Sequence, residues 1–260
     1  MNFYSKTLSL NQLLKKLFMR NISSVIIGLA FIVGLFILGK AYKYRSTTME
    51  TITVTGSAEK DFISDLIVWN GSYSRKSMDM KSAYAQLKND ENTIRAYLTG
   101  KGINNNEIVF FSININKEFN YKTDENGRSL GQEFSGYNLS QNVKIESLTV
   151  DKIDQISREA TELIEKGIEF NSSSPLFYYT KLTEVKMDLL AKASADGKAR
   201  AEIIAKNAGS SLGKLKKATL GVFQITGKNS NEDYSYGGAF NTSSKNKTGA
   251  ITIRMEFAVD

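Results

Sequence analysis

The sequence contains no cysteine, no histidine and only one proline in 260 residues. Without cysteine and histidine, the chain cannot form disulfides, thiol nucleophiles, the usual zinc and copper sites or a Ser-His-Asp triad. An enzyme built from this chain would have to work with carboxylates, lysine, tyrosine or serine. The single proline also argues against a proline-rich linker or a wall-spanning stalk.

Positive charge is concentrated at the start of the chain. The sequence has 34 Lys and Arg residues against 27 Asp and Glu residues, a formal net charge of +7. Residues 1–50 hold seven of these basic residues and one acid, Glu50, which leaves 27 basic against 26 acidic residues, or +1, for the remainder. The basic start suits anionic lipid head groups. The remainder lacks the positive footprint of a nucleic-acid-binding protein, so we expect no nucleic-acid partner.

Residues 21–39 carry no charged side chain. As a helix, at about 1.5 Å per residue, this run would span about 28 Å, close to the ~30 Å hydrocarbon core of a bilayer. The alternatives are a cleaved signal peptide and a buried core helix. The residues after the run offer no small-residue cleavage site, and the run has no polar stripe beyond Ser23 and Ser24. We therefore predict an uncleaved transmembrane signal anchor.

The flanking charges indicate an orientation. The residues before the run include four basic side chains and no acid, and positive charge favours the cytoplasmic side. The bias is slight, because Lys40, Lys43 and Arg45 follow the run. We expect a short basic cytoplasmic tail at 1–20, an inner-membrane anchor at 21–39, a linker at 40–50 and an extracytoplasmic, periplasmic domain at 51–260.

Hydrophobic periodicity divides this domain into short elements. The expected strands are 51–55, 66–74, 108–116, 137–146, 176–180, 215–225 and 250–259. The expected helices are 79–100, 151–167 with Asp151 as its cap, and 181–208, the last two ending at Gly167 and Gly209. In the strand at 108–116 we expect Val109, Phe111, Ile113 and Ile115 to share one side. Residues 122–133 are expected to be a loose hairpin loop. Residues 228–248, with Tyr234 and Tyr236, are expected to be a mobile excursion or a partner-binding loop.

This order of elements favours an α+β fold. Half-polar strands that alternate with helices are typical of a mainly antiparallel sheet with one wet face. The middle of the domain follows the order of a split βαβ unit. We predict a two-layer sandwich of sheet and helices.

Two acids, Asp65 and Asp196, are the first candidates for a functional site. A catalytic carboxylate pair is conceivable, but acids at strand starts and on helix faces more often cap backbone groups or pair with lysine. Gly237 and Gly238 lack the sequence context of a phosphate-binding loop. We assign no catalytic, cofactor-binding or metal-binding residue.

The long helix carries a pattern that resembles a known family. Residues 191–213 repeat alanine around Asp196 and end in Gly209, Leu212 and Gly213. This stretch is similar to the signature helix of the SIMPL-domain family, a domain of unknown function that includes bacterial periplasmic immunogenic proteins. Further similarities, covering about residues 51–259, occur at 53–58, Asp65, 98–103, 107–108 and 136–137.

The chain also departs from the family pattern. Ser64 stands where the family usually has proline, Ser57 replaces the second glycine, and Gly197 stands where the helix normally has alanine. Glycine inside a helix costs ~1 kcal/mol relative to alanine, so this position suggests a kink or a close contact. The family supplies no established catalytic residues. The resemblance implies an envelope location, an α+β fold and self-association.

From these observations we predict a non-catalytic assembly or interaction module of the bacterial cell envelope. The alternative is a small-ligand receptor or a carboxylate-based enzyme with a cleft between helices and sheet. We expect a homo-oligomer, with strands 51–55 and 250–259 as sheet edges. Ala195, Ala199 and Ala205 would form a small-residue contact face. Whether the module also binds another envelope protein is left open.

Overall fold

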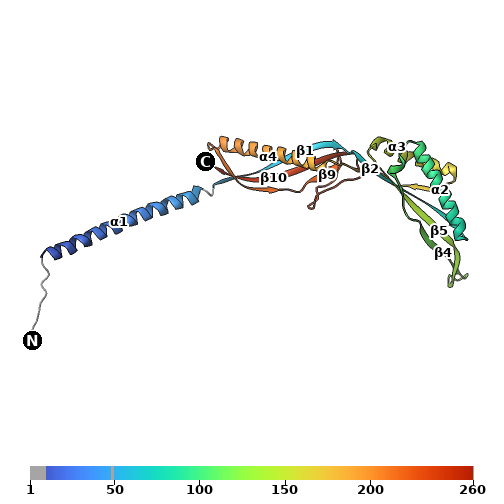
Figure 1. Ribbon diagram of the computed structural model, residues 1–260, viewed down its shortest axis with the longest axis horizontal. Coiled ribbons are helices and arrows are strands. Elements are labelled where there is room, and N and C mark those ends of the chain that lie inside the picture. Colours follow the sequence, from blue (N-terminus) through green and yellow to red (C-terminus); the bar gives the residue numbers. More distant parts are fainter. Residues whose placement is uncertain (1–9, 48–49, 260) are drawn as a thin grey trace, which may run out of the picture. The chain divides into compact units, whose positions relative to one another are not determined.

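A computed structural model describes residues 10–47 and 50–259 (Figure 1). The protein forms two compact units. Unit 1 comprises the described residues up to Val54, Lys198–Thr219 and the described residues from Arg254; unit 2 comprises Thr55–Gly197 and Leu220–Ile253. Helices and antiparallel strands are combined throughout, which confirms the α+β class.

Unit 1 begins with helix α1, Leu10–Thr47. Within it, Val25–Lys43 is long and apolar enough to cross a membrane, with a mean hydropathy of 2.3, and none of it is buried within the protein. Apolar surface left in water costs roughly 25 cal/mol per Å², so a lipid environment suits this segment. The helix continues through Thr47, so most of the expected linker at 40–50 is helical.

The first sheet has the strand order β1–β10–β8, and β9 also pairs with β10. The bounds are β1 Thr51–Ile63, β8 Leu212–Leu220, β9 Gln224–Gly227 and β10 Asn246–Val259. The expected strand at 51–55 is too short, because β1 continues through Gly56. The expected strand at 215–225 is divided into β8 and β9. In β10, Ile251, Ile253, Met255 and Phe257 are buried, as their alternation predicts.

Helix α4, Leu182–Asn207, contacts β1 closely within unit 2. A Cβ atom on Gly56 would lie 2.1 Å from the carbonyl oxygen of Ala193 and 2.5 Å from the backbone nitrogen of Gly197. Glycine inside a strand is typical of such close backbone approach. Gly197 is therefore a close-contact position. The helix ends before Gly209, whose φ of 77° is left-handed, as expected.

The second sheet, in unit 2, has the order β3–β5–β2–β6, with β4 paired to β5 and β7 paired to β2. The bounds are β2 Leu66–Ser77, β3 Ile108–Phe110, β4 Asn114–Thr123, β5 Ser129–Ser147, β6 Phe170–Ser172 and β7 Leu176–Tyr178. The paired strands are antiparallel, with Trp69 opposite Ile145 in the β2–β5 register. The short strand β6 is an element that the sequence analysis missed.

Two helical segments cover this sheet around one hydrophobic core. They are α2, Met80–Gly100, and α3, Val150–Glu159, which continues as the 3₁₀ segment η2, Ala160–Lys166. The 3₁₀ turn η1, Asn105–Glu107, precedes β3. Asp79 caps α2 by accepting a hydrogen bond from the backbone N–H of Ser82 at 2.9 Å. The apolar side chains that recur at helical spacing in the sequence are buried, as this periodicity predicts; they are Ala83, Leu87, Ile94, Leu98, Ile153, Ile156, Ala160 and Leu163. The cap of α3 is Thr149 rather than Asp151.

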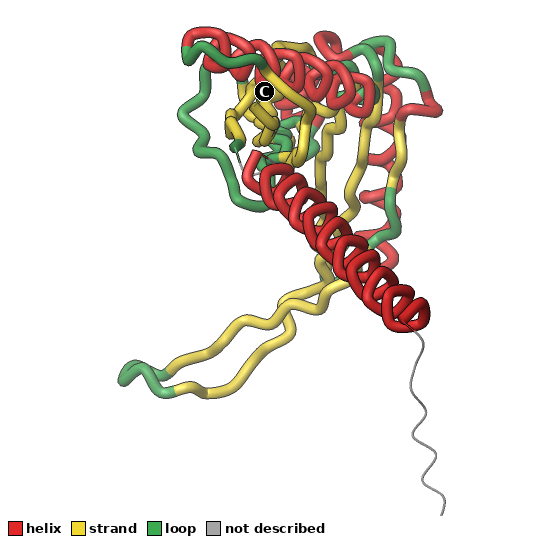
Figure 2. The backbone as a smooth tube through the Cα atoms, turned by 90° about the vertical axis from the view of Figure 1, so that its left-hand side faces the viewer, coloured by secondary structure: helices red, strands yellow, loops and turns green. Residues whose placement is uncertain are grey.

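The region from 108 to 133 differs from our expectation. The expected strand at 108–116 is two strands. Val109 pairs with Lys144 whereas Ile115 pairs with Leu139, so their side chains lie on opposite faces of the sheet and the predicted shared side is wrong. Ile108 is buried, while Val109, Phe111 and Ile115 are exposed. Strands β4 and β5 pair as far as Thr123 and Ser129, so the expected loose loop is a short turn. Asp124 closes this turn by accepting from the backbone N–H of Arg128 at 2.8 Å. Figure 2 shows the hairpin as a two-stranded arm.

A charged pair is built into the same unit. The Asp90 side chain is 5% exposed and accepts two hydrogen bonds from the Arg75 guanidinium, at 2.5 and 2.9 Å. The same guanidinium donates to the carbonyl oxygen of Gly167 at 2.7 Å. The hydrogen bond to Asp90 is the main cause of a raised pKa of Arg75. This pair connects β2, α2 and the end of η2.

Candidate functional site

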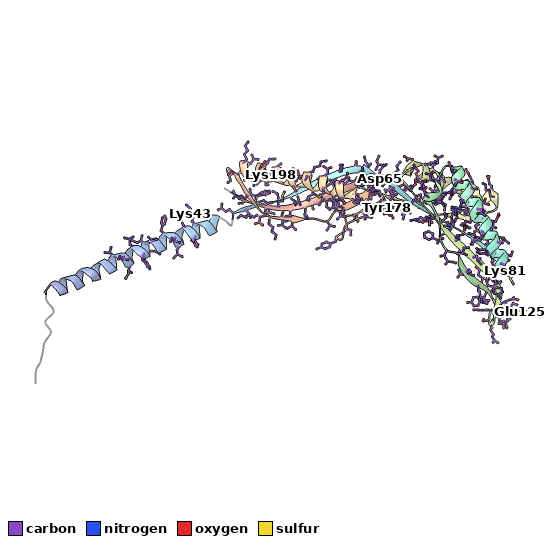
Figure 3. All side chains as sticks on the ribbon, in the orientation of Figure 1. Lys43, Asp65, Lys81, Glu125, Tyr178 and Lys198 are labelled. Atoms are coloured by element: carbon purple, nitrogen blue, oxygen red, sulfur yellow. The ribbon has the colours of Figure 1, made fainter. Side chains whose placement is uncertain are left out.

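The structure places Asp65 in a backbone-binding role. Its carboxylate accepts hydrogen bonds from the backbone N–H and the hydroxyl of Thr180, both at 2.7 Å. Its own backbone N–H donates to the carbonyl oxygen of Tyr178 at 3.1 Å. Asp65 and Tyr178 are labelled in Figure 3. Asp65 therefore fixes the chain that leads into α4.

Asp196 performs a similar task on a different part of α4. Its carboxylate accepts a hydrogen bond from the backbone N–H of Ser57 in β1 at 2.9 Å. Thr180 precedes α4, whereas Asp196 lies near its fourth turn, about 20 Å further along the helix axis. The two acids thus bind different backbone groups and do not form a carboxylate pair. Among the described residues, no cluster of three or more acidic side chains could hold a metal.

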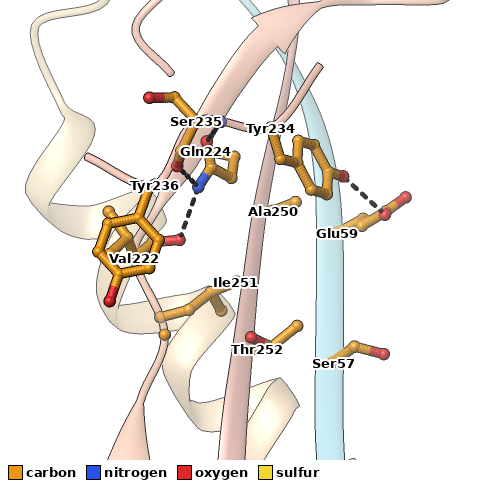
Figure 4. A pocket seen from close by; sticks show the side chains of 11 residues that line it. Ser57, Glu59, Val222, Gln224, Tyr234, Ser235, Tyr236, Ala250, Ile251 and Thr252 are labelled. Carbon is orange, nitrogen blue, oxygen red and sulfur yellow. Dashed lines mark hydrogen bonds between the residues drawn. The ribbon is translucent and has the colours of Figure 1, made fainter. Parts of the chain in front are cut away.

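The described part of unit 2 contains a groove of about 440 Å³ on the first sheet. Its floor includes Ala250, Ile251 and Thr252 of β10, and its sides come from β1, the segment before β9 and the loop before β10 (Figure 4). The lining residues are Ser57, Glu59, Gly221, Val222, Gln224, Tyr234, Ser235, Tyr236, Ala250, Ile251 and Thr252. Within the described ranges 10–47 and 50–259, no helix contributes a lining residue. This groove therefore does not lie between helices and sheet, where the alternative hypothesis expected a cleft.

Strand alternation explains which side chains reach the groove. Gly56 faces α4. Side chains alternate between the two faces of a strand, so Ser57 and Glu59 share the face opposite to Gly56. Both are exposed. On β10, Ala250 and Thr252 share one face in the same way, and Ala250 is buried. The groove therefore occupies the face of the sheet turned away from α4.

Gln224 holds the segment that carries the two groove tyrosines. Its side chain is buried, and its amide donates to the carbonyl oxygen of Ser235 at 2.8 Å. Its side-chain oxygen accepts from the backbone N–H groups of Ser235 at 3.2 Å and Ala239 at 2.7 Å. One buried side chain thus fixes the backbone between Tyr234 and Tyr236. Because the Gln224 amide is fully hydrogen-bonded, its burial carries only a small free-energy penalty.

A buried lysine holds the far end of the same loop. Lys247 is 2% exposed and donates to the carbonyl oxygen of Asn241 at 2.5 Å. Burial lowers the pKa of Lys247 to about 8, with Glu232 acting in the opposite direction. Glu232 in turn accepts from the backbone N–H of Gly227 at 3.1 Å and from the side chain of Asn241. The loop expected to be a mobile excursion is bonded to the sheet at several points.

The groove has negative electrostatic character. The Tyr234 hydroxyl donates to the Glu59 carboxylate at 3.4 Å (Figure 4). Partial burial and the neighbouring Glu59 carboxylate raise the pKa of Tyr234. Tyr234 is 60% exposed and Tyr236 is fully exposed. Two accessible aromatic rings and one carboxylate are thus available to a ligand.

The predicted contact face of the long helix is divided. Ala205 is buried and belongs to the core, whereas Ala195 and Ala199 are exposed. Ile203 and Ile204, in unit 1 with Ala199, are 60% and 48% exposed. The outward surface of α4 therefore combines a small residue with two accessible isoleucines.

The sheet edges are also only partly as expected. β1 is an edge strand, as predicted, but β10 lies between β1 and β8, so the prediction that 250–259 forms an edge is wrong. Among the described strands, β8 is the other edge. β4 is an edge of the second sheet, and its arm exposes Phe119 and Tyr121.

The sequence analysis missed the main groove residues, Glu59 and Gln224. Glu59 lies in β1, but the strand expected at 51–55 ended before it. Gln224 stands between Phe223 and Ile225, and one polar residue inside an apolar strand is the signal that could have pointed to a buried hydrogen-bonding role.

The structure is an α+β domain that follows one apolar helix. The family model for SIMPL, a protein of unknown function (DUF541), matches residues 52–258. The chain therefore belongs to the SIMPL family, and the match covers nearly all of the domain after α1. No curated protein matches the chain.

Proposed function

We propose that this protein is a membrane-anchored, extracytoplasmic assembly module of the bacterial cell envelope, without catalytic activity of its own. The anchor rests on the unburied apolar segment Val25–Lys43. The orientation rests on the basic residues before it, since positive charge favours the cytoplasmic side. The non-catalytic role is supported by Asp65 and Asp196, whose carboxylates bind backbone groups.

The outward surface of α4 is the observation that carries the assembly role. Ala199 lets a second surface approach closely, and Ile203, one turn further along the same helix face, offers accessible apolar area beside it. We assign this surface to a second copy of the chain. Anchoring in one membrane raises the local concentration of identical domains, which favours such association. The net charge of +1 after residue 50 leaves little repulsion between copies.

The anchor and the orientation can be tested in cells. The protein should stay in the membrane fraction after salt and alkaline washing, and a mature form beginning near residue 40 to 50 would show a cleaved signal instead. A reporter fused after residue 260 should behave as extracytoplasmic. Protease added to spheroplasts should digest residues 50–260, and full protection would place the domain inside.

Self-association can be tested with one matched pair of variants. Ala199→Glu should lower the mass of the full-length protein in detergent, measured by multi-angle light scattering, because it places a charge in the contact. Ala85→Glu makes the same change at an exposed position of α2 and should leave the mass unchanged. A monomeric wild-type protein at tens of micromolar would contradict the assembly role. Unfolding of the Ala199→Glu variant would show that this surface belongs to the core.

A further inference from the structure

The groove beside Tyr234 and Tyr236 has a chemistry that the assembly role does not use. We propose that it binds a small molecule with a quaternary ammonium group, of the choline type. Among the described residues that line the groove, Glu59 is the one that is charged at neutral pH. This inference does not depend on the assembly role, because the α4 residues assigned to the contact with a second copy are not among the described residues that line the groove.

The charge of the lining selects a cation over an anion. Among the residues that the structure describes, no lysine or arginine lines the groove, so an anionic ligand would meet the Glu59 carboxylate without a compensating positive charge. Tyrosine rings present negative faces, which attract a cation placed over them. The carboxylate and the two rings therefore favour a cation through two separate effects.

The hydrogen-bonding state of the lining selects the kind of cation. A primary ammonium carries three N–H donors and needs acceptors to replace water. The side-chain oxygen of Gln224 already accepts from Ser235 and Ala239, so the Glu59 carboxylate, which accepts from Tyr234 and keeps further lone pairs, is the one charged acceptor among the described lining residues for three N–H donors. A quaternary ammonium donates no hydrogen bond and presents methyl groups, which suit the apolar surface of Ala250 and Val222 in the groove. The groove thus fits a methylated cation better than a primary one.

The backbone that carries the tyrosines is held in place before any ligand arrives. Gln224 bonds both backbone groups of Ser235, and the backbone N–H of Gly238 donates to the carbonyl oxygen of Ser235 at 3.0 Å. Gly238 has a φ of 95°, and a Cβ atom there would lie 2.9 Å from the carbonyl oxygen of Phe223. A backbone fixed on both sides lowers the ordering cost of binding. The exposed rings of Tyr234 and Tyr236 can then lose water without a change of fold.

The size of the groove sets the class of ligand. A volume of about 440 Å³ lies within the range of small-molecule sites. It can hold a trimethylammonium head and a short chain beyond it. The exposed hydroxyls of Ser57 and Thr252 are available to a polar group on that chain.

Three probes of closely related shape test the proposal. Choline is the cationic probe, 3,3-dimethylbutan-1-ol is its neutral isostere, and ethanolamine is its primary-ammonium analogue. Each is titrated by calorimetry into the full-length protein in a polyoxyethylene detergent, which carries neither choline nor sugar head groups. We expect choline to bind about ten-fold or more tightly than either analogue. Equal binding of the neutral isostere, or no choline binding at ~100 mM, would overturn the proposal.

Variants connect this binding to the groove. Glu59→Gln and Tyr236→Ala should each weaken choline binding about five-fold or more, because each removes one of the two effects that favour a cation. The matched controls are Glu165→Gln on η2 and Tyr121→Ala on β4, which lie outside the groove and are exposed. Unchanged affinity in both groove variants would overturn the assignment. Binding of a neutral sugar such as glucose in place of choline would identify a carbohydrate site instead.

Discussion

The contact between Gly56 and helix α4 makes the strongest quantitative prediction. In a Gly56→Ala variant, the new methyl group would lie 2.1 Å from the carbonyl oxygen of Ala193 and 2.8 Å from the Cα atom of Gly197. Favourable contacts between such atoms begin near 3.5 Å. Both opposing groups are backbone, so no side chain can rotate away. The helix itself must move by about 1 Å or more from β1.

Two costs follow from that movement. Overpacking of a well-packed contact costs typically 1–3 kcal/mol. The bond between the Ser57 N–H and Asp196, now 2.9 Å, would lengthen and lose about 1 kcal/mol. The reduced freedom of the unfolded chain returns roughly 0.4–1 kcal/mol in favour of alanine. We expect Gly56→Ala to lower the free energy of unfolding by about 2 kcal/mol.

The protein carries its own probe for this measurement. Trp69 is the single tryptophan and is fully buried in unit 2, so its fluorescence reports urea unfolding of the full-length protein in detergent. Gly100→Ala is the control, because a Cβ atom there meets nothing within 4 Å and alanine favours a helix. It should be neutral or slightly stabilising. A Gly56→Ala variant within about 0.5 kcal/mol of wild type would refute the close-contact reasoning.

Three further predictions concern single side chains. Arg75→Ala should lower the free energy of unfolding in urea by about 3 kcal/mol, because it leaves the buried Asp90 carboxylate unpaired. Adding Asp90→Asn should recover part of this loss. A double variant less stable than Arg75→Ala alone would contradict the reasoning. Asp65→Ala should cost about 1–2 kcal/mol in the same assay, because the backbone N–H of Thr180 loses its acceptor, while the exposed Asp233→Ala should be neutral. Burial lowers the pKa of Lys247 to about 8 from 10.5, so the unfolded state binds more protons between these values and wild-type stability should rise with pH across that window. In Lys247→Met this contribution should vanish, and parallel pH profiles of the two proteins would refute it.

The fold class and most helices could be predicted because their signals are local. The inner faces of α2 and α3 follow from helical periodicity, and Gly167 and Gly209 mark helix ends through left-handed backbone. Strand β10 follows from strict alternation, since one side of it is buried. In each case the side chains that the sequence pattern places on the core-facing side are buried in the structure.

The failures come from contacts that the local pattern does not contain. The apolar series Val109, Phe111 and Ile115 predicts one shared side of a single strand, but Val109 lies in β3 and Ile115 in β4, and all three side chains are exposed. Gly56 suggests a strand end, yet its small size serves the approach of α4 from over 130 residues away in sequence. The groove could not be predicted either, because Glu59, Gln224 and Tyr234 are brought together by tertiary structure.

The position of β10 bears on how the domain can be made. This strand pairs with β1, β8 and β9, yet it follows all of them in the sequence. Until residues 246–259 have emerged, β1 and β8 each lack their partner and expose open hydrogen-bonding edges. Such long-range pairing forms slowly and leaves incomplete chains prone to aggregation. A chain crossing a membrane would therefore need protection of its earlier strands until this last one arrives.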